Sequence, residues 1–383
     1  MQASSLDMIR TLIGFDTVSR NSNMALIDYV RDYLKGHGIE SHLVASPDGN
    51  KANLFATVGP NVEGGVVLSG HTDVVPVDGQ PWSTDPFVLT EKDGRLYGRG
   101  TCDMKSFVAI GLAMVPQMAQ ADLKRPIHFA LSYDEEVGCL GAPAMIDRLV
   151  TDIAKPSAVV IGEPSSMKPI MAHKGLAVAR TTVIGHEAHS SQMQRGVSAV
   201  MTAARLINYL EDMMAKNKAQ ADPDSPFVPP YTTLHVGTIQ GGTAVNIISR
   251  ECSFTWDTRV LPGESLRDYL DRFQAYCDSL LPAMQAIAPT ASITTELLAD
   301  APPLTSEGDD TAQQLAMRLS GCSHCQVVPF ATEGGQFQER GYSVVVCGPG
   351  SIDQAHQPDE FIEISQVEAC EGFIDRLIRE LEQ

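Results

Sequence analysis

The sequence predicts an α/β protein: a doubly wound, mostly parallel sheet with a smaller α+β domain inserted into it. Three observations predict this fold. Strands alternate with helices up to Lys174, the order of elements changes after that residue, and 383 residues are too many for one ordinary core. We expect a discontinuous main domain, residues 1–174 and 291–383, and an inserted domain, residues 175–290.

The first part of the chain alternates helices and strands. Residues 25–38 form an expected helix that ends at a glycine, and residues 64–77 are an apolar strand followed by a loop. A long, mostly apolar helix is expected over residues 105–120. The next two strands, residues 126–136 and 156–165, both end in carboxylates. Such alternation is typical of a sheet covered by helices on both faces.

A different order of elements follows Lys174. A strand with a turn is followed by a helix, two strands, a second helix and a last strand at the return to the main domain; these cover residues 175–191, 198–216, 232–242, 249–261, 264–281 and 291–299. The order β-α-β-β-α-β is that of a split βαβ, ferredoxin-like domain.

Charge and hydropathy exclude several classes of protein. The net charge of −19 argues against nucleic-acid binding, which usually needs a basic face. No apolar run is long enough to span a bilayer, so we expect no membrane partner. The first twenty residues lack a basic segment followed by an apolar one, so no signal peptide is expected and a cytoplasmic location is predicted.

The cysteines do not point to a metal site. Of eight, only Cys322 and Cys325, in "CSHC", have the spacing of a metal or redox pair. A structural zinc site normally needs a second pair at suitable spacing, and the sequence has none. We interpret the cysteines as free thiols.

Metal-ligating residue types recur where strands of the main domain are expected to end. These residues are His71, Asp73, Asp103, Glu135, Glu136, Glu163 and His356. In open α/β sheets, ligands bind at the carboxyl ends of the strands, so residues far apart in sequence are expected to converge there. Two imidazoles and several carboxylates suit zinc, cobalt or manganese.

The motifs around these residues resemble the M20 family of di-metal aminoacylases and peptidases. The matching segments are "SGHTDVVPVDGQPWSTDPF", "LYGRGTCDMK" and "DEEVG". The segments "TEGGQF" and "GPGSIDQAHQPDEFIE" resemble the acetylornithine deacetylases of that family. The resemblance covers nearly the whole chain, and it implies that the inserted domain serves as a lid or dimerisation domain.

The resemblance implies two divalent metal ions, with zinc favoured and cobalt or manganese as alternatives. Asp103 would bridge them, because one carboxylate can hold two cations ~3.5–4 Å apart. His71 and Glu163 would complete one ion, and Glu136 and His356 the other.

Two further acidic residues are predicted to act beside the metals. Asp73 would orient the imidazole of His71. Glu135 would take the proton of a water between the ions and pass it to the departing amine, as general base and then general acid. Adjacent side chains of an extended segment point in different directions, so Glu136 can face the metal while Glu135 faces the water.

Residues for substrate binding are carried over from the same resemblance. His189, in "GHEAHSS", would stabilise the oxyanion in the partner subunit's site, which favours a homodimer. Arg259 would bind the substrate's α-carboxylate, and Asn246 would help to position it. Backbone N–H groups of Gly348, Gly350 and Ser351 can contact the same carboxylate. Glu333 is expected to pair with a cationic ammonium of the substrate, or instead to cap the turn that follows it.

The implied activity is hydrolysis of N2-acetyl-L-ornithine to L-ornithine and acetate, the reaction of arginine biosynthesis. Other substrates stay open, because sites in the family differ by few residues: acetylcitrulline, succinyl-diaminopimelate, N-acetylmethionine as for a general aminoacylase, or a dipeptide. A non-catalytic binding protein that kept the fold is disfavoured, since every position of the constellation is filled.

Overall fold

The computed structural model describes residues 1–383 as two compact units. The first unit contains residues 1–172, 304–327 and 332–383, and the second contains residues 173–303 and 328–331. None of the helices combines the length and the apolar character needed to cross a membrane.

An eight-stranded sheet forms the centre of the first unit. In spatial order its strands are β1 (Ser41–Ala45), β2 (Ala52–Val58), β6 (Ile127–Ser132), β3 (Val66–His71), β7 (Ala158–Pro164), β14 (Val344–Gly348), β8 (Ile170–His173) and β13 (Gln326–Val328). The four central strands, β6, β3, β7 and β14, are parallel to one another. Strands β1, β2 and β8 pair antiparallel with their neighbours toward the edges.

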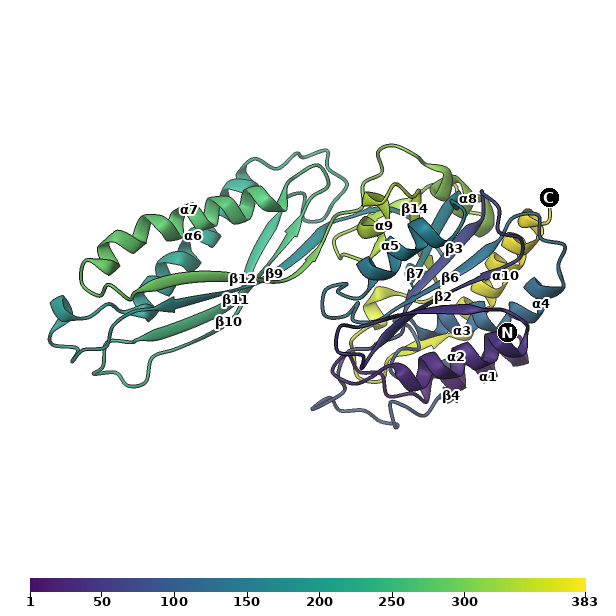
Figure 1. Ribbon diagram of the computed structural model, residues 1–383, viewed down its shortest axis with the longest axis horizontal. Helices are drawn as coiled ribbons and strands as arrows, with labels where there is room; N and C mark the ends of the chain where they lie inside the picture. The colour runs from purple at the N-terminus through teal and green to yellow at the C-terminus, as the bar shows by residue number, and fades with distance from the viewer. The chain divides into compact units, whose positions relative to one another are not determined.

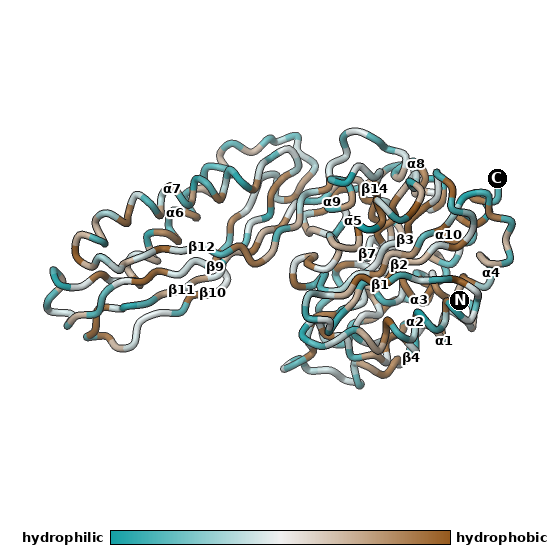
Figure 2. Tube along the Cα trace, in the orientation of Figure 1, coloured by the Kyte–Doolittle hydropathy of each residue, from teal (hydrophilic) through white to brown (hydrophobic).

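Helices cover both faces of this sheet (Figure 1). They are α1 (Ala3–Ile13), α2 (Met24–Gly36), α3 (Lys105–Ala113), α4 (Val115–Gln120), α5 (Ala142–Asp152), α8 (Thr311–Ser320), α9 (Gly334–Glu339) and α10 (Ile364–Leu381). Every residue of β3, β6 and β7 is buried, as expected for strands covered on both sides. In Figure 2 the chain is coloured as hydrophobic along much of the central sheet. A small sheet of β15 (Phe361–Glu363), β5 (Arg95–Tyr97) and β4 (Thr90–Lys92) completes the unit.

The second unit is an antiparallel sheet with two helices. Its strands lie in the order β10 (Thr233–Gly241), β11 (Glu251–Val260), β9 (Gly175–Ile184) and β12 (Ser292–Ala301). Helices α6 (Ala199–Ala219) and α7 (Leu266–Gln285) pack against it and share an apolar core that includes Phe254, Trp256 and Phe273. This is the split βαβ, ferredoxin-like arrangement.

Two details differ from the expectations. The helix expected over residues 105–120 is divided at Met114 into α3 and α4, because Pro116 has no N–H to donate and its ring collides with the preceding turn. The return to the main domain was placed at residue 291, but β12 pairs with β9 along its length, so the second unit continues to Pro303.

Candidate metal centre

The five predicted metal ligands meet at the carboxyl ends of the parallel strands. His71 is the last residue of β3, and Glu163 is the last but one of β7. Glu136 lies in the loop after β6, His356 in the loop after β14, and Asp103 just before α3. This edge of an open α/β sheet is where such folds bind ligands.

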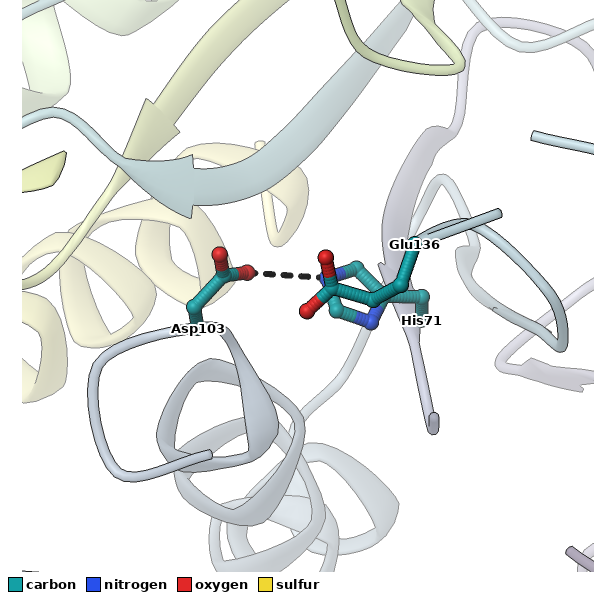
Figure 3. A group of neighbouring side chains, drawn as sticks. All are labelled: His71, Asp103 and Glu136. Carbon is teal, nitrogen blue, oxygen red and sulfur yellow. Dashed lines mark hydrogen bonds and ion pairs between the residues drawn. The ribbon is translucent and has the colours of Figure 1, made fainter. Parts of the chain in front are cut away.

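Asp103 lies between the two histidines. One carboxylate oxygen, Oδ1, is 2.9 Å from Nε2 of His71, and the other, Oδ2, is 3.3 Å from Nε2 of His356. His71 is also 3.5 Å from Glu163, whereas His356 is 3.0 Å from Glu136. The five side chains therefore form two halves that share Asp103, and Figure 3 shows Asp103 with its neighbours His71 and Glu136.

The imidazole of His71 is held by the backbone. Its Nδ1 donates to the carbonyl oxygen of Asp73 at 2.9 Å, so Nε2 is the ring nitrogen that faces the carboxylates. A hydrogen bond of this kind fixes the tautomer of a metal-binding histidine. The Asp73 carboxylate is farther from the ring, 3.6 Å at its nearest oxygen.

Instead, the Asp73 carboxylate holds the turn that carries the two glutamates. Its oxygens accept the backbone N–H groups of Glu135 at 3.2 Å and Glu136 at 3.3 Å, and the hydroxyl of Ser19 at 2.7 Å. Adjacent glutamates repel each other, and a turn anchored through both of its N–H groups keeps the two side chains at the site. Asp73 thus orients His71 with its backbone and the glutamates with its side chain.

The carboxylates are crowded and buried. Burial raises the pKa of Glu135 to about 8 and that of Glu136 to about 7, and it raises the pKa of Glu163 well above its usual range. Burial opposes ionisation of Asp103 too, but hydrogen bonds from His356 and His71 outweigh it and lower the pKa. Hydrogen bonds to Asp103 and Glu136 raise the pKa of His356 to about 10. This group of buried carboxylates therefore favours a positive charge between them.

The donor set fits divalent cations. No lysine or arginine forms an ion pair with Asp103, Glu135, Glu136 or Glu163, and the buried Oε1 of Glu136 has no hydrogen-bond donor. A buried carboxylate oxygen without a donor is costly, and a cation would satisfy it. Ligand atoms of His71, Asp103 and Glu136 lie within 4.8 Å of one another, and so do those of His71, Glu135 and Glu163. Oxygen and imidazole donors of this kind suit zinc, cobalt or manganese.

His356→Ala is expected to empty one half of the site first. The imidazole of His356 pairs with Asp103 and Glu136, and its side chain is the most exposed of the five, at 54%. Metal analysis after dialysis should give about one ion per chain in place of two, with the remaining ion on the His71 side. His324→Ala, in an exposed loop, is the matched control. Equal loss of both ions would contradict the division into two halves.

Glu333 has partners other than the predicted ones. Its carboxylate is buried, at 1% exposure, and accepts the hydroxyls of Ser69 at 2.5 Å and Ser132 at 2.8 Å. It makes no capping hydrogen bond to α9. Each carboxylate oxygen of Glu333 therefore accepts from a serine, and neither caps the turn. The pairing of Glu333 with a substrate ammonium stays a prediction.

The "GPGS" segment also differs from expectation. The N–H groups of Gly348, Gly350 and Ser351 donate to side-chain oxygens of Ser165, Gln366 and Gln354, respectively. They are not free to contact a substrate carboxylate. Close packing explains the first glycine, since a Cβ there would lie 1.9 Å from the carbonyl oxygen of Gly162.

The other predicted site residues belong to the second unit. His189 is exposed, and its Nδ1 lies 2.8 Å from the hydroxyl of Ser191 and 3.2 Å from the backbone N–H of the same residue. The neighbouring backbone connects this loop to Asn246, whose carbonyl accepts the N–H of Ser190 at 3.0 Å. Arg259 is half-buried beside Asp257, 3.5 Å from its carboxylate.

His189 and Arg259 lie toward opposite ends of the second unit's sheet. Arg259 pairs with Leu176 at the start of β9, whereas Glu251 pairs with Ile184 at its end, five residues before His189. Eight strand residues at ~3.3 Å each separate these pairs by about 26 Å. These two strand positions are farther apart than the length of a small substrate.

The sequence reasoning missed three residues that support the site. Ser19 contacts Asp73, and Lys51 Nζ pairs with Asp134, next to Glu135, at 2.5 Å. The Cys139 thiol donates to Glu135 Oε1 at 3.3 Å. None of them stands in a recognisable metal-binding pattern, although Cys139 lies only four positions after Glu135.

Comparisons with known proteins identify the family of the chain. The family described as peptidase family M20/M25/M40 matches residues 67–380. An acetylornithine deacetylase of Pasteurella multocida (strain Pm70) is 36% identical over 384 residues, which cover 98% of this chain and 97% of that protein.

Solved structures share the fold. An M20 family metallo-carboxypeptidase of Sulfolobus solfataricus aligns with a TM-score of 0.77 at 16% identity, over 100% of both chains. The YXEP protein of Bacillus subtilis, described as a dinuclear metal binding peptidase from the M20 family, aligns with a TM-score of 0.63 at 16% identity, over 99% of this chain and 98% of that one. These matches confirm the predicted fold class and the resemblance seen in the motifs. The chain therefore belongs to peptidase family M20/M25/M40 and is a metal-dependent hydrolase.

Proposed function

We propose that the chain hydrolyses N2-acetyl-L-ornithine to L-ornithine and acetate. The observation that carries the proposed chemistry is the position of Asp103, whose two oxygens face His71 and His356 separately. The acetylornithine deacetylase that matches almost the whole chain supports the choice of substrate. In this proposal His71, Asp103 and Glu163 hold one divalent ion, and Asp103, Glu136 and His356 hold the other.

The proposed chemistry assigns a proton transfer to Glu135. Two divalent ions held by these residues would lower the pKa of a bound water toward ~7 and would polarise the amide carbonyl. Glu135 accepts the proton of the attacking water and gives it to the departing amine. Asp73 keeps Glu135 in place through the backbone N–H of that residue.

Residues of the second unit are proposed to bind the substrate and its oxyanion. His189 can donate from Nε2 to the oxyanion of the tetrahedral intermediate, a contact on the scale of about 3 kcal/mol. Arg259 can bind the α-carboxylate through bidentate hydrogen bonds, and Asn246 can help to position the substrate. Because the β9 positions nearest Arg259 and His189 in register or sequence are about 26 Å apart, we assign His189 and Asn246 to the partner subunit of a homodimer.

A substrate panel tests the proposal. The metal-reconstituted protein is assayed for amine release from acetylornithine, acetylcitrulline, acetylmethionine, succinyl-diaminopimelate and Gly-ornithine. We expect kcat/KM for acetylornithine to exceed that of every other substrate at least tenfold, since about 1.4 kcal/mol of selective binding suffices. A flat profile would indicate a general aminoacylase, and preference for Gly-ornithine would indicate a dipeptidase.

A further inference from the structure

A buried carboxylate in the first unit holds the peptide that carries Asp103. Glu360 is 1% exposed. Its Oε1 accepts the N–H groups of Cys102 at 2.8 Å and Asp103 at 3.0 Å. Its Oε2 accepts the N–H of Gly100 at 3.1 Å and Nη1 of Arg99 at 2.7 Å. Every one of these donors belongs to the segment that leads into Asp103, so Glu360 fixes the direction from which that side chain leaves the backbone.

Arg99 connects this segment to the loop of His356. Nη1 of Arg99 also donates to the carbonyl of Gln357 at 3.3 Å, and Nη2 donates to the side-chain oxygen of Gln80 at 2.6 Å. The amide of Gln80 in turn donates to the carbonyl oxygen of His356 at 2.9 Å. The two segments that supply Asp103 and His356 are therefore joined by one continuous set of hydrogen bonds.

The backbone of His356 has a conformation that needs support from its neighbours. His356 has a φ of 62°, in the left-handed region, which is unfavourable for a residue other than glycine. Such a conformation persists only where the surrounding structure determines it. The hydrogen bond from Gln80 and the Arg99 contact to the next carbonyl hold this backbone in place, with Nε2 of His356 turned toward Asp103.

Stability of the fold alone does not explain why Arg99 and Glu360 form a buried ion pair. Arg99 and Glu360 are both almost fully buried, and replacing such a pair by apolar residues is often neutral or stabilising. We propose that Glu360 is a positioning residue for the metal centre, which through Arg99 and Gln80 sets Asp103 and His356 at the spacing that two cations require. This inference rests on the proposed function.

Cobalt titration of the metal-free protein tests the inference without an activity assay. The visible spectrum of Co²⁺ reports its coordination, and the titration gives a dissociation constant for each equivalent. Glu360→Gln keeps the size of the side chain but removes its charge and places an amide NH₂ against the donors of Gly100 and Arg99. Loss of a residue that orients metal ligands typically weakens metal binding about 10–100-fold, and we expect this loss for both equivalents.

The control is Glu363→Gln, an exposed glutamate three residues further on, paired only with Arg95. It should bind Co²⁺ as the unaltered chain does. Melting temperatures of the metal-free variants are recorded as well, because a purely structural role would lower them and leave the dissociation constants unchanged.

A second variant covers the case in which Glu360→Gln fails to fold because Arg99 is left buried without its partner. Gln80→Ala, at a partly exposed position, removes the hydrogen bonds of the Gln80 side chain to the His356 carbonyl, Arg99 and Trp82, but it leaves the pair of Arg99 and Glu360 in place. It should weaken binding of the Co²⁺ equivalent on the His356 side and leave the other equivalent unchanged. Wild-type affinity in every variant that folds, Gln80→Ala included, would overturn the inference. Failure of the unaltered chain to bind two equivalents would instead count against the proposed function.

Discussion

Replacement of Glu135 by Gln is expected to lower kcat by at least ~10²-fold while two metal ions stay bound. General acid–base catalysis typically contributes 10²–10⁴-fold, and glutamine cannot accept the proton. The N–H of residue 135 still donates to Asp73 in this variant, so the turn and Glu136 keep their places. Steady-state rates and metal content, measured on the same preparation, check this expectation.

The metal content decides between two roles for Glu135. Its carboxylate lies within 4.8 Å of the ligand atoms of His71 and Glu163, so the distances alone also allow it to be a ligand. Loss of an ion from Glu135→Gln would reassign the residue to metal binding. The matched control is Glu91→Gln, on the exposed strand β4, which should change neither quantity.

Asp103→Asn is expected to lose both ions and with them the activity. An amide offers one oxygen in place of two, and its NH₂ group would point at one of the cations. Metal ions supply several kcal/mol of transition-state stabilisation, so the rate should fall on the order of 10³-fold or more. Metal analysis after dialysis should find fewer than one ion per chain.

Thermal unfolding separates loss of metal from loss of fold in this variant. Metal that binds only the native state raises Tm. Added Zn²⁺ should therefore raise the Tm of the unaltered chain, and that increase should largely disappear in Asp103→Asn. The metal-free forms should melt at similar temperatures, because the substitution also removes one charge from a crowded group of carboxylates. Retention of two ions by Asp103→Asn would exclude Asp103 as the shared ligand.

The fold could be predicted where local signals were strong. Local patterns located α2 and the two helices of the second unit, the apolar strand β3, and the strands β6 and β7 that lead into carboxylates. Helices α5, α8, α9 and α10 were not predicted. The break at Met114 was missed because a single proline in an apolar run was not treated as a helix end. The antiparallel outer strands were not predicted either, since strand direction depends on pairing between segments distant in sequence.

The candidate metal ligands and their grouping around Asp103 could be carried over from the motifs, but the partners of the residues around them could not. His71, Asp103, Glu136, Glu163 and His356 stand in motifs that name a chemistry. Nothing in those motifs indicates that Glu333 is held by two serines, or that "GPGS" uses its N–H groups internally. Side-chain partners of this kind come from neighbouring strands and loops.

The sequence by itself determined the family, the α/β class with its inserted ferredoxin-like domain, and the residues able to bind metal. These follow from local patterns, because ligand type and strand or helix period are properties of short segments. Only the tertiary structure decided that the Asp73 carboxylate anchors the glutamate turn, and that Glu360 joins the segments of Asp103 and His356. The physical reason is that buried polar groups must find partners, and those partners lie wherever the fold brings distant segments together.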